Sequence, residues 1–294
     1  MKKIFAYSFF VFLLIAFIFL AFLHLHKKKR PAYPITKQVQ YSFTVQNTTN
    51  KSLANAELWT YAPVKQTATQ LCKDIETSYP YQLTEDEWGN QILYFKFKNL
   101  PPYATKLIQI KASLKLSDRP NDIQANQIES FLQSSPYIES DHLEIQKKAE
   151  SFKASNVVET VNRIFKWVTH HITYTGYLKN DRGALYALKH KKGDCTEYMY
   201  LFTAMCRANK IPARGIGGYI CKESTKLKPR DFHNWSEFYH NDTWGIADPQ
   251  NDTLMKNSAN YIAMRIIHDA PQKNHPQFNK FYFRGKGLKV TMDS

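Results

Sequence analysis

Two stretches near the start of the chain alternate between hydrophobic and polar residues. Every second residue of 39–45 is Val, Tyr or Phe, and every second residue of 108–116 is Ile, Ala or Leu. Residues 92–97 form a third run of strand-forming residues, and turns containing Asn, Gly or Pro separate the runs. A period of two is typical of strands with one buried face. We therefore predict an immunoglobulin-like β-sandwich over residues 31–118, with either a substrate-positioning or a passive structural role.

A helical period follows the polar linker at residues 117–122. Hydrophobic residues recur every three or four positions over 157–172, which predicts a helix packed on a core. Asn156 or Ser155 is the expected N-cap, because these side chains accept hydrogen bonds from the first N–H groups of a helix. We interpret this hydrophobic stripe as core packing only.

A second helix is predicted to begin directly after Asp194. Asp194 is a good N-cap residue, and Glu197 lies three positions later, so the pair forms a capping-box motif. Cys195 is then the first residue inside the helix, where the helix dipole favours a thiolate over a thiol. A thiolate is a nucleophile, so this position indicates covalent catalysis. The alternative is that Cys195 is simply a small buried residue.

Downstream, two strand-forming runs flank a polar turn and predict a hairpin. With the turn centred between His240 and Asn241, His233 lies opposite Asp248, give or take one register step. Opposed side chains have Cβ atoms about 4.5–5.5 Å apart, so a carboxylate there can orient an imidazole ring. Each residue alone has an ordinary explanation, as a surface His or a strand-ending Asp. Their combination with Cys195 predicts a nucleophile, a base and an orienting group.

These residues resemble the core of the transglutaminase-like superfamily. The similarity lies in residues 193–197, 207–214, 217–219, 233–235 and 244–249. It is specific over residues 183–251 and looser from Asp122 onward, so the implied domain is 122–294. The resemblance implies an α+β, papain-like domain with Cys195 as nucleophile, His233 as base and Asp248 as orienter. We expect no cofactor and no metal.

The superfamily includes amide hydrolases, amine-transferring transglutaminases and members without an intact triad, so the resemblance indicates thioester chemistry but not the acyl acceptor. We expect hydrolysis of a peptide, protein or cell-envelope amide. The loop 222–231 has four Lys or Arg residues and no aromatic residue, which predicts an open polar rim. Trp235 and Trp244 could wall an amine tunnel, but core packing is the simpler interpretation. Amine transfer and an idle binding module are the alternatives, and the Cys195 N–H is the expected oxyanion donor.

The N-terminus predicts a membrane anchor. Residues 4–23 are uncharged and mostly apolar, and about twenty such residues span a bilayer core as a helix. The basic run 27–30 follows, and no small-x-small cleavage motif lies near it. We therefore predict an uncleaved single-pass helix within residues 1–30. The basic flank favours a cytoplasmic catalytic domain, whereas anchored relatives favour an extracytoplasmic one, which we expect.

The 294-residue chain carries a formal net charge of +15. Part of this excess flanks the predicted anchor, where it suits acidic lipid headgroups. The remainder is scattered, and the sequence contains no recognisable nucleic-acid module, so no nucleic-acid partner is expected. The adjacent His170 and His171 point about 100° apart on a helix and are not expected to share a metal ion. The predicted fold class is therefore multidomain: a transmembrane helix, a β-sandwich and an α+β transglutaminase-like domain.

Overall fold

The computed structural model describes residues 31–123, 127–268, 276 and 278–294. Residues from Tyr33 to Ser294 form one compact unit. The predicted transmembrane segment and its basic flank, residues 1–30, lie outside the described residues. No helix in the described part of the chain is both long enough and apolar enough to cross a bilayer.

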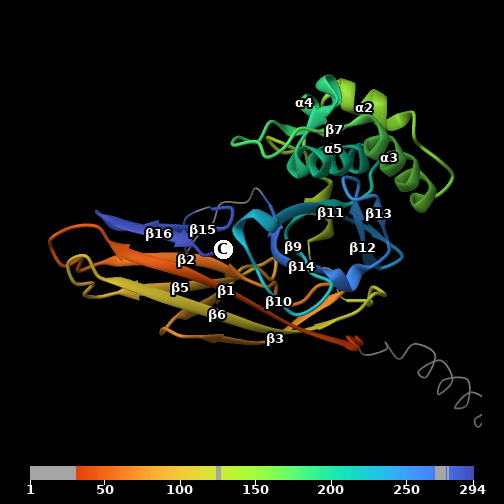
Figure 1. The fold of residues 1–294 in the computed structure, drawn as a ribbon. Helices are drawn as coiled ribbons and strands as arrows, with labels where there is room; N and C mark the ends of the chain where they lie inside the picture. Colours follow the sequence, from red (N-terminus) through yellow and green to blue (C-terminus); the bar gives the residue numbers. More distant parts are fainter. Residues whose placement is uncertain (1–30, 124–126, 269–275, 277) are drawn as a thin grey trace, which may run out of the picture. The chain divides into compact units, whose positions relative to one another are not determined.

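Two β-sheets stack to form a sandwich (Figure 1). One has the strand order β10-β1-β6-β3, with β16 also paired to β1, and the other has the order β15-β2-β5-β4. The strands are β1 (Ile35–Asn47), β2 (Ala56–Ala62), β3 (Gln70–Thr77), β4 (Gln82–Glu85), β5 (Gln91–Phe97), β6 (Thr105–Leu116), β10 (Thr225–Lys226), β15 (Phe281–Arg284) and β16 (Leu288–Met292).

The long pair β1 and β6 confirms the alternation seen in the sequence. Tyr41 faces Ile110 and Phe43 faces Ile108 across the antiparallel ladder, and all four side chains are buried. The residues between them along β1 are more polar. A period of two therefore places one face of this pair against the second sheet.

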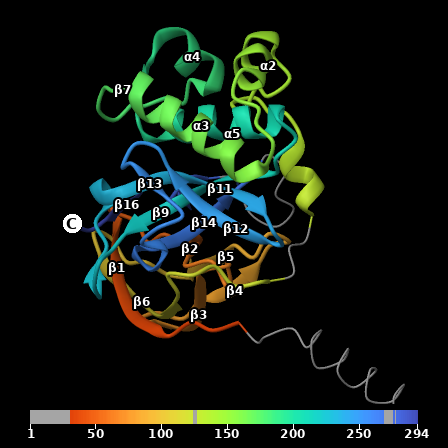
Figure 2. The same cartoon turned by 90° about the vertical axis from the view of Figure 1, so that its right-hand side faces the viewer.

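The remaining residues form a five-stranded sheet with the order β13-β12-β11-β9-β14, and the α-helices lie over one face of it (Figures 1 and 2). The elements are η1 (Ile128–Leu132), α2 (Leu143–Glu150), α3 (Val157–His171), β7 (Thr173–Tyr174), α4 (Gly183–His190), β8 (Lys192–Gly193), α5 (Cys195–Ala208), β9 (Ala213–Ile220), η2 (Pro229–Asp231), β11 (Phe232–His240), β12 (Thr243–Asp248), β13 (Thr253–Leu254), η3 (Ser258–Asn260) and β14 (Tyr261–Ile267).

Both predicted helices begin directly after the residues predicted to cap them. Helix α3 begins after Asn156, whose side chain accepts a hydrogen bond from the N–H of Glu159 at 2.9 Å. Helix α5 begins at Cys195 and is almost entirely buried between the other helices and the five-stranded sheet. It is therefore the central helix of this half of the molecule.

The predicted fold class was wrong. The described residues are mostly β, with four α-helices, and none of those helices could span a membrane. The C-terminal strands β15 and β16 return to the sandwich, where they pair with β2 and β1. Residues such as Tyr219, Leu227 and Ile262 also belong to the core of the sandwich. Sheet edges need partners, and here the distant C-terminal segment supplies them.

Candidate active site

The start of α5 has the capping box that the sequence predicts. Asp194 Oδ1 accepts from the N–H of Thr196 at 2.8 Å, and Glu197 Oε2 accepts from the N–H of Asp194 at 3.0 Å. Glu197 is fully buried, and this burial raises the pKa of its carboxyl group. A Cβ on Gly193 would lie 2.3 Å from Glu197 Cβ, so only glycine fits there.

Cys195 is partly exposed at this helix end, whereas Cys72, Cys206 and Cys221 are buried; all four cysteines are free. Burial raises the pKa of the Cys221 thiol to about 11 and also raises that of Cys206. The N–H of Cys195 has no hydrogen-bond partner among the described residues, since the capping box uses its two neighbours. Cys195 thus combines an accessible thiol with an available N–H at a helix N-terminus.

The hairpin brings His233 and Asp248 together, but in a different register from the predicted one. Asn241 and Asp242 both have positive φ, at 46° and 60°, and form the two-residue turn that closes His240 against Thr243. The turn therefore lies one residue later than predicted. Moving the turn by one residue shifts the residue opposite His233 by two positions. Because side chains alternate between the two faces of a strand, the imidazole and the carboxylate still lie on the same face, as diagonal neighbours.

Asp248 is the centre of a dense hydrogen-bond network. Its Oδ2 lies 2.8 Å from His233 Nε2 and accepts from the Tyr261 hydroxyl at 2.9 Å and from Asn251 Nδ2 at 2.8 Å. Its Oδ1 accepts from the Asn251 N–H at 3.3 Å. The carboxylate is 1 % exposed, so these donors replace water and hold it in place.

The environment of His233 favours the protonated ring. Burial alone would lower its pKa, but hydrogen bonds and charges from Asp248 and Cys195 outweigh that effect and raise the pKa to about 9. Nε2 is engaged by Asp248, which leaves Nδ1 as the nitrogen available to the thiol. The arrangement therefore favours the imidazolium form of His233 at neutral pH.

Polar contacts fix the strand of His233 against the helix of Cys195. Asn234 Nδ2 donates to Thr196 Oγ1 at 2.9 Å, so the two residues that follow His233 and Cys195 are joined directly. Further along, Ser236 Oγ donates to the carbonyl of Met199 at 3.1 Å. These contacts hold the register between α5 and β11, and no local sequence signal predicts them.

Two further residues at this site were missed in the sequence. Asn251 lies only three positions after Asp248, so its place in the turn after β12 was a usable signal. Tyr261 begins β14 and reaches Asp248 through the sheet topology, for which the sequence offers no local signal. Tyr174 and Tyr177, which precede α4, are well exposed.

The two tryptophans near the hairpin pack in the core. Trp235 is buried, lies nearly parallel to the His233 ring at a centroid distance of 6.3 Å, and contacts Tyr261 edge-on. Trp244 is also buried and packs edge-on against Phe131. Neither ring is exposed enough to wall a tunnel for an amine.

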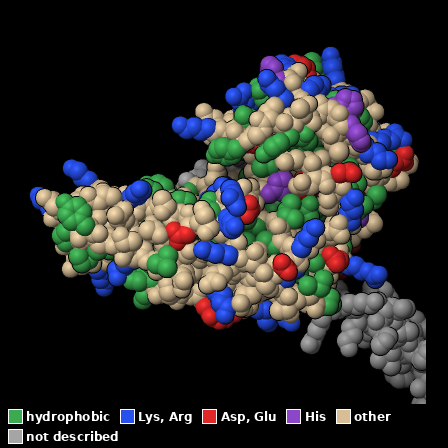
Figure 3. Space-filling model, in the orientation of Figure 1, with side chains coloured by type: hydrophobic (Ala, Val, Ile, Leu, Met, Phe, Trp, Pro, Cys, Tyr) green, Lys and Arg blue, Asp and Glu red, His purple; other side chains and the backbone are tan. Residues whose placement is uncertain are grey.

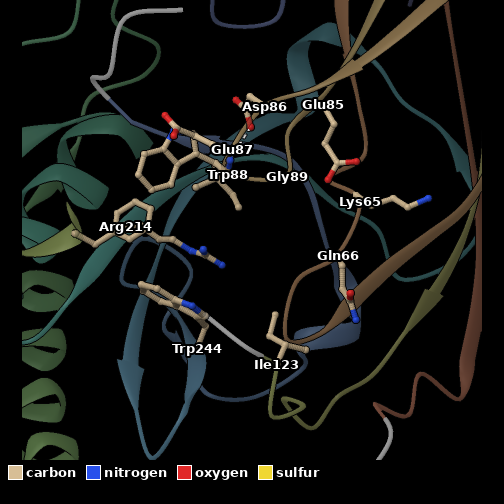
Figure 4. Close-up of a pocket in the computed structure, with 12 residues that line it drawn as sticks. Lys65, Gln66, Glu85, Asp86, Glu87, Trp88, Gly89, Ile123, Arg214 and Trp244 are labelled. Atoms are coloured by element: carbon tan, nitrogen blue, oxygen red, sulfur yellow. Dashed lines mark hydrogen bonds between the residues drawn. The ribbon is translucent and has the colours of Figure 1, made fainter. Parts of the chain in front are cut away.

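A cavity of about 330 Å³ lies elsewhere, between the sandwich and the five-stranded sheet (Figure 4). Arg214 and Trp244 point into it from one side, and Gln66 and Glu85 lie on the other. The Arg214 guanidinium is 4.0 Å from the Trp244 ring centroid and pairs with Glu237 at 2.7 Å. Its described lining contains none of the three predicted catalytic residues.

Basic side chains are distributed over the visible face of the molecule. Figure 3 shows Lys and Arg on both the helical layer and the sandwich, interspersed with acidic groups, and not gathered into one patch. The excess of positive charge is therefore spread over the surface in this view.

Comparison with known proteins places the domain that holds this site. Residues 146–249, which include Cys195, His233 and Asp248, match the family described as the transglutaminase-like superfamily. This region belongs to the transglutaminase-like superfamily. The match supports cysteine-dependent catalysis as the general chemistry of the domain. No curated relative matches the sequence.

Solved structures show a similar fold. A candidate cysteine protease from Cytophaga hutchinsonii has a TM-score of 0.58 and 19% identity, with 88% of this chain and 92% of that chain covered. The periplasmic domain of TgpA from Pseudomonas aeruginosa has a TM-score of 0.39 and 14% identity, with 71% of this chain and 87% of that chain covered. The first match spans both the sandwich and the transglutaminase-like region, so their arrangement occurs in another protein.

Proposed function

We propose that this protein is a cysteine-dependent enzyme that hydrolyses peptide or related amide bonds through a Cys195 thioester. The observation that carries the proposal is His233, whose Nε2 lies 2.8 Å from Asp248 Oδ2 and whose ring also interacts with the Cys195 thiol. A nucleophile, a base and an orienting carboxylate form one connected unit. Such a unit suits acyl transfer.

In the first step, the Cys195 thiolate attacks the amide carbonyl carbon and forms a C–S bond. The carbonyl oxygen becomes an oxyanion, and the free N–H of Cys195 at the start of α5 is the donor placed to stabilise it. The His233 imidazolium then gives its proton to the amide nitrogen as the C–N bond breaks. The amine leaves, and the acyl group remains on sulfur as a thioester.

In the second step, neutral His233 removes a proton from water as the water oxygen attacks the thioester carbon. The C–S bond breaks, a carboxylic acid leaves, and the thiolate–imidazolium pair is restored. Asp248 keeps its position throughout, because its buried oxygens are held by Tyr261 and Asn251 as well as by the ring. Its role is to orient His233 and stabilise its charged form.

Water is the proposed acceptor because nothing near the triad among the described residues encloses a dry channel. Most residues of the 222–231 loop are exposed, and Trp235 and Trp244 are core residues. An amine must outcompete water at roughly 55 M, which requires tight positioning and solvent exclusion to reach a high effective molarity. An open polar rim offers neither.

Product analysis by mass spectrometry tests this choice. The protein is incubated with peptide and protein amide substrates in the presence of millimolar primary amine, with Cys195→Ala as the matched control. We expect mostly the free acid product, formed only by the wild-type protein. Mostly amine-linked product would favour the transglutaminase alternative, and product from Cys195→Ala would reject the mechanism.

A further inference from the structure

A lysine from the far C-terminal segment reaches the region of the proposed nucleophile. Lys280 directly precedes β15 and is half-buried. Its Nζ donates to the carbonyl of Pro229 at 3.1 Å and lies 4.7 Å from the centroid of the Phe232 ring. Phe232 is the residue before His233 at the start of β11. The ammonium group is therefore held beside the strand that carries the base.

Lys280 differs from the buried Arg214, which pairs with Glu237 at 2.7 Å. No carboxylate forms an ion pair with Lys280 within the described part of the chain. Burial lowers its pKa, and the charge of Cys195 opposes that effect, so the two groups interact electrostatically.

This combination differs from an ordinary surface lysine. A carbonyl and an aromatic ring fix the side chain, which reduces the conformational entropy lost when it binds a ligand. A partly desolvated cation without a carboxylate partner gains from binding an anion. Phe232 and Asn234 lie on the same face of β11, and Asn234 contacts Thr196, the residue after Cys195, so an anion bound to Lys280 would lie on the Cys195 side of the sheet.

We propose that Lys280 binds a carboxylate of the substrate beside the scissile amide. The inference rests on the proposed function and narrows its substrate class to amides that carry a negative charge next to the reacting bond. The carboxylate belongs either to an acidic side chain or to a free chain terminus. Lys280 lies outside the 146–249 family match, so this preference would be a property of this chain's C-terminal segment.

Matched substrate pairs test the preference in the full-length protein. One pair differs by Glu against Gln beside the scissile bond, and another by a free terminal carboxylate against its amide. We expect wild-type kcat/KM to favour the charged member of at least one pair by about tenfold or more, since hydrogen bonds between charged groups are worth about 1.5–3 kcal/mol. Which pair responds identifies the source of the carboxylate.

Three variants complete this test. Lys280→Met should abolish the preference for the charged member, and Lys280→Arg should keep most of it. Lys286→Met, which removes an exposed lysine of the same segment, should leave the preference unchanged. The readout is the ratio within a pair, because Lys280 also acts on the charge of Cys195. An equal ratio for wild type and Lys280→Met in both pairs would overturn the proposal.

Alkylation separates failure of this inference from failure of the proposed function. Iodoacetate and iodoacetamide both react by displacement of iodide and formation of a C–S bond, but only iodoacetate carries a carboxylate. We expect Lys280→Met to lower the iodoacetate-to-iodoacetamide rate ratio at Cys195 severalfold, measured by peptide mass spectrometry. An unchanged ratio overturns the anion site even without an active substrate. Iodoacetamide labelling of Cys195 that is independent of His233 instead contradicts the proposed function.

Discussion

Two buried ion pairs share strand β11 and have different consequences. His233 and Glu237 are four residues apart on β11, so their side chains point to the same face of the sheet. His233 pairs with Asp248 on β12, and Glu237 pairs with Arg214 directly across from it on β9. Both pairs are almost entirely buried.

The difference lies in what surrounds each pair. The Arg214 guanidinium lies against Trp244 and Phe131, and both of its bonds to Glu237 stay within the protein. The His233 ring, in contrast, has Nε2 bound to Asp248, and its other nitrogen is available to the partly exposed Cys195 thiol. A buried ion pair therefore indicates function only when one member is joined to a reactive and accessible group.

The largest expected effect comes from removing the reacting groups themselves. Cys195→Ala removes the nucleophile, and His233→Ala removes the proton donor and acceptor. Each should lower kcat/KM by about 10⁴-fold or more, while circular dichroism and thermal melting stay near wild type. Activity within about tenfold of wild type in either variant would show that this site does not carry the chemistry.

Asp248→Asn sharpens the comparison because it keeps the shape but removes the charge. We expect kcat/KM to fall by about 10³-fold, since the amide no longer stabilises the imidazolium. Wild-type activity should fall above about pH 9, where His233 loses its proton and can no longer protonate the leaving amine. In the variant this alkaline limit should move to lower pH. An identical pH profile for both proteins would contradict the role of Asp248.

The same proton is linked to stability. Folding raises the pKa of His233 from its ordinary value of 6.5 to about 9, so the protonated ring stabilises the fold. This contribution is complete below about pH 6.5 and is lost as the pH rises through about 9. The thermal midpoint of wild type should therefore fall relative to that of His233→Gln over this range. A constant difference between the two would contradict the shift.

Breaking the Arg214–Glu237 pair should lower stability and leave activity nearly unchanged. Glu237→Gln leaves the buried guanidinium without a charged partner and should destabilise the protein by about 3–5 kcal/mol. The fraction that remains folded should keep kcat/KM within about threefold of wild type, because Glu237 has no contact with the triad. Chemical denaturation and active-site titration with a cysteine probe separate the two effects. A loss of kcat/KM per folded molecule comparable to that of Asp248→Asn would remove the contrast between the pairs.

The smallest effect concerns the support of Asp248. Tyr261→Phe removes one of the hydrogen bonds to Oδ2 and should reduce kcat/KM by about tenfold or less, because Asn251 still holds the carboxylate. Tyr239→Phe is the matched control, since that hydroxyl contacts Asp242 in the hairpin turn at 3.5 Å. Equal effects of the two changes would assign Tyr261 a packing role only.

Local signals explain which parts of the fold could be predicted. The alternation in β1 and β6, the N-cap Asn156 and the capping box at Cys195 all act over a few residues and were confirmed. The hairpin register was off by two because the positive φ of Asn241 and Asp242 selects a two-residue turn, and several polar residues there suited a turn. His233 and Asp248 still lie on one face, because a shift by an even number of residues keeps each side chain on the same face of the sheet.

Long-range pairing explains what could not be predicted. Strands β15 and β16 are short and pair with strands more than 200 residues earlier, so no local pattern assigns them to the sandwich. Tyr261 reaches Asp248 because β14 pairs with β9, a pairing that no local pattern predicts either. The sequence thus indicated the reacting groups, whereas the residues that support them depend on the completed topology.

Trapping the acyl-enzyme tests the central claim most directly. The full-length protein is mixed with an amide substrate and quenched in acid within the turnover time, and its peptides are analysed by mass spectrometry. We predict an added acyl mass on the peptide that contains Cys195, which hydroxylamine removes, and none in Cys195→Ala. An acyl group on Cys72, Cys206 or Cys221, or product formation with no acylated cysteine at any quench time, would contradict the account.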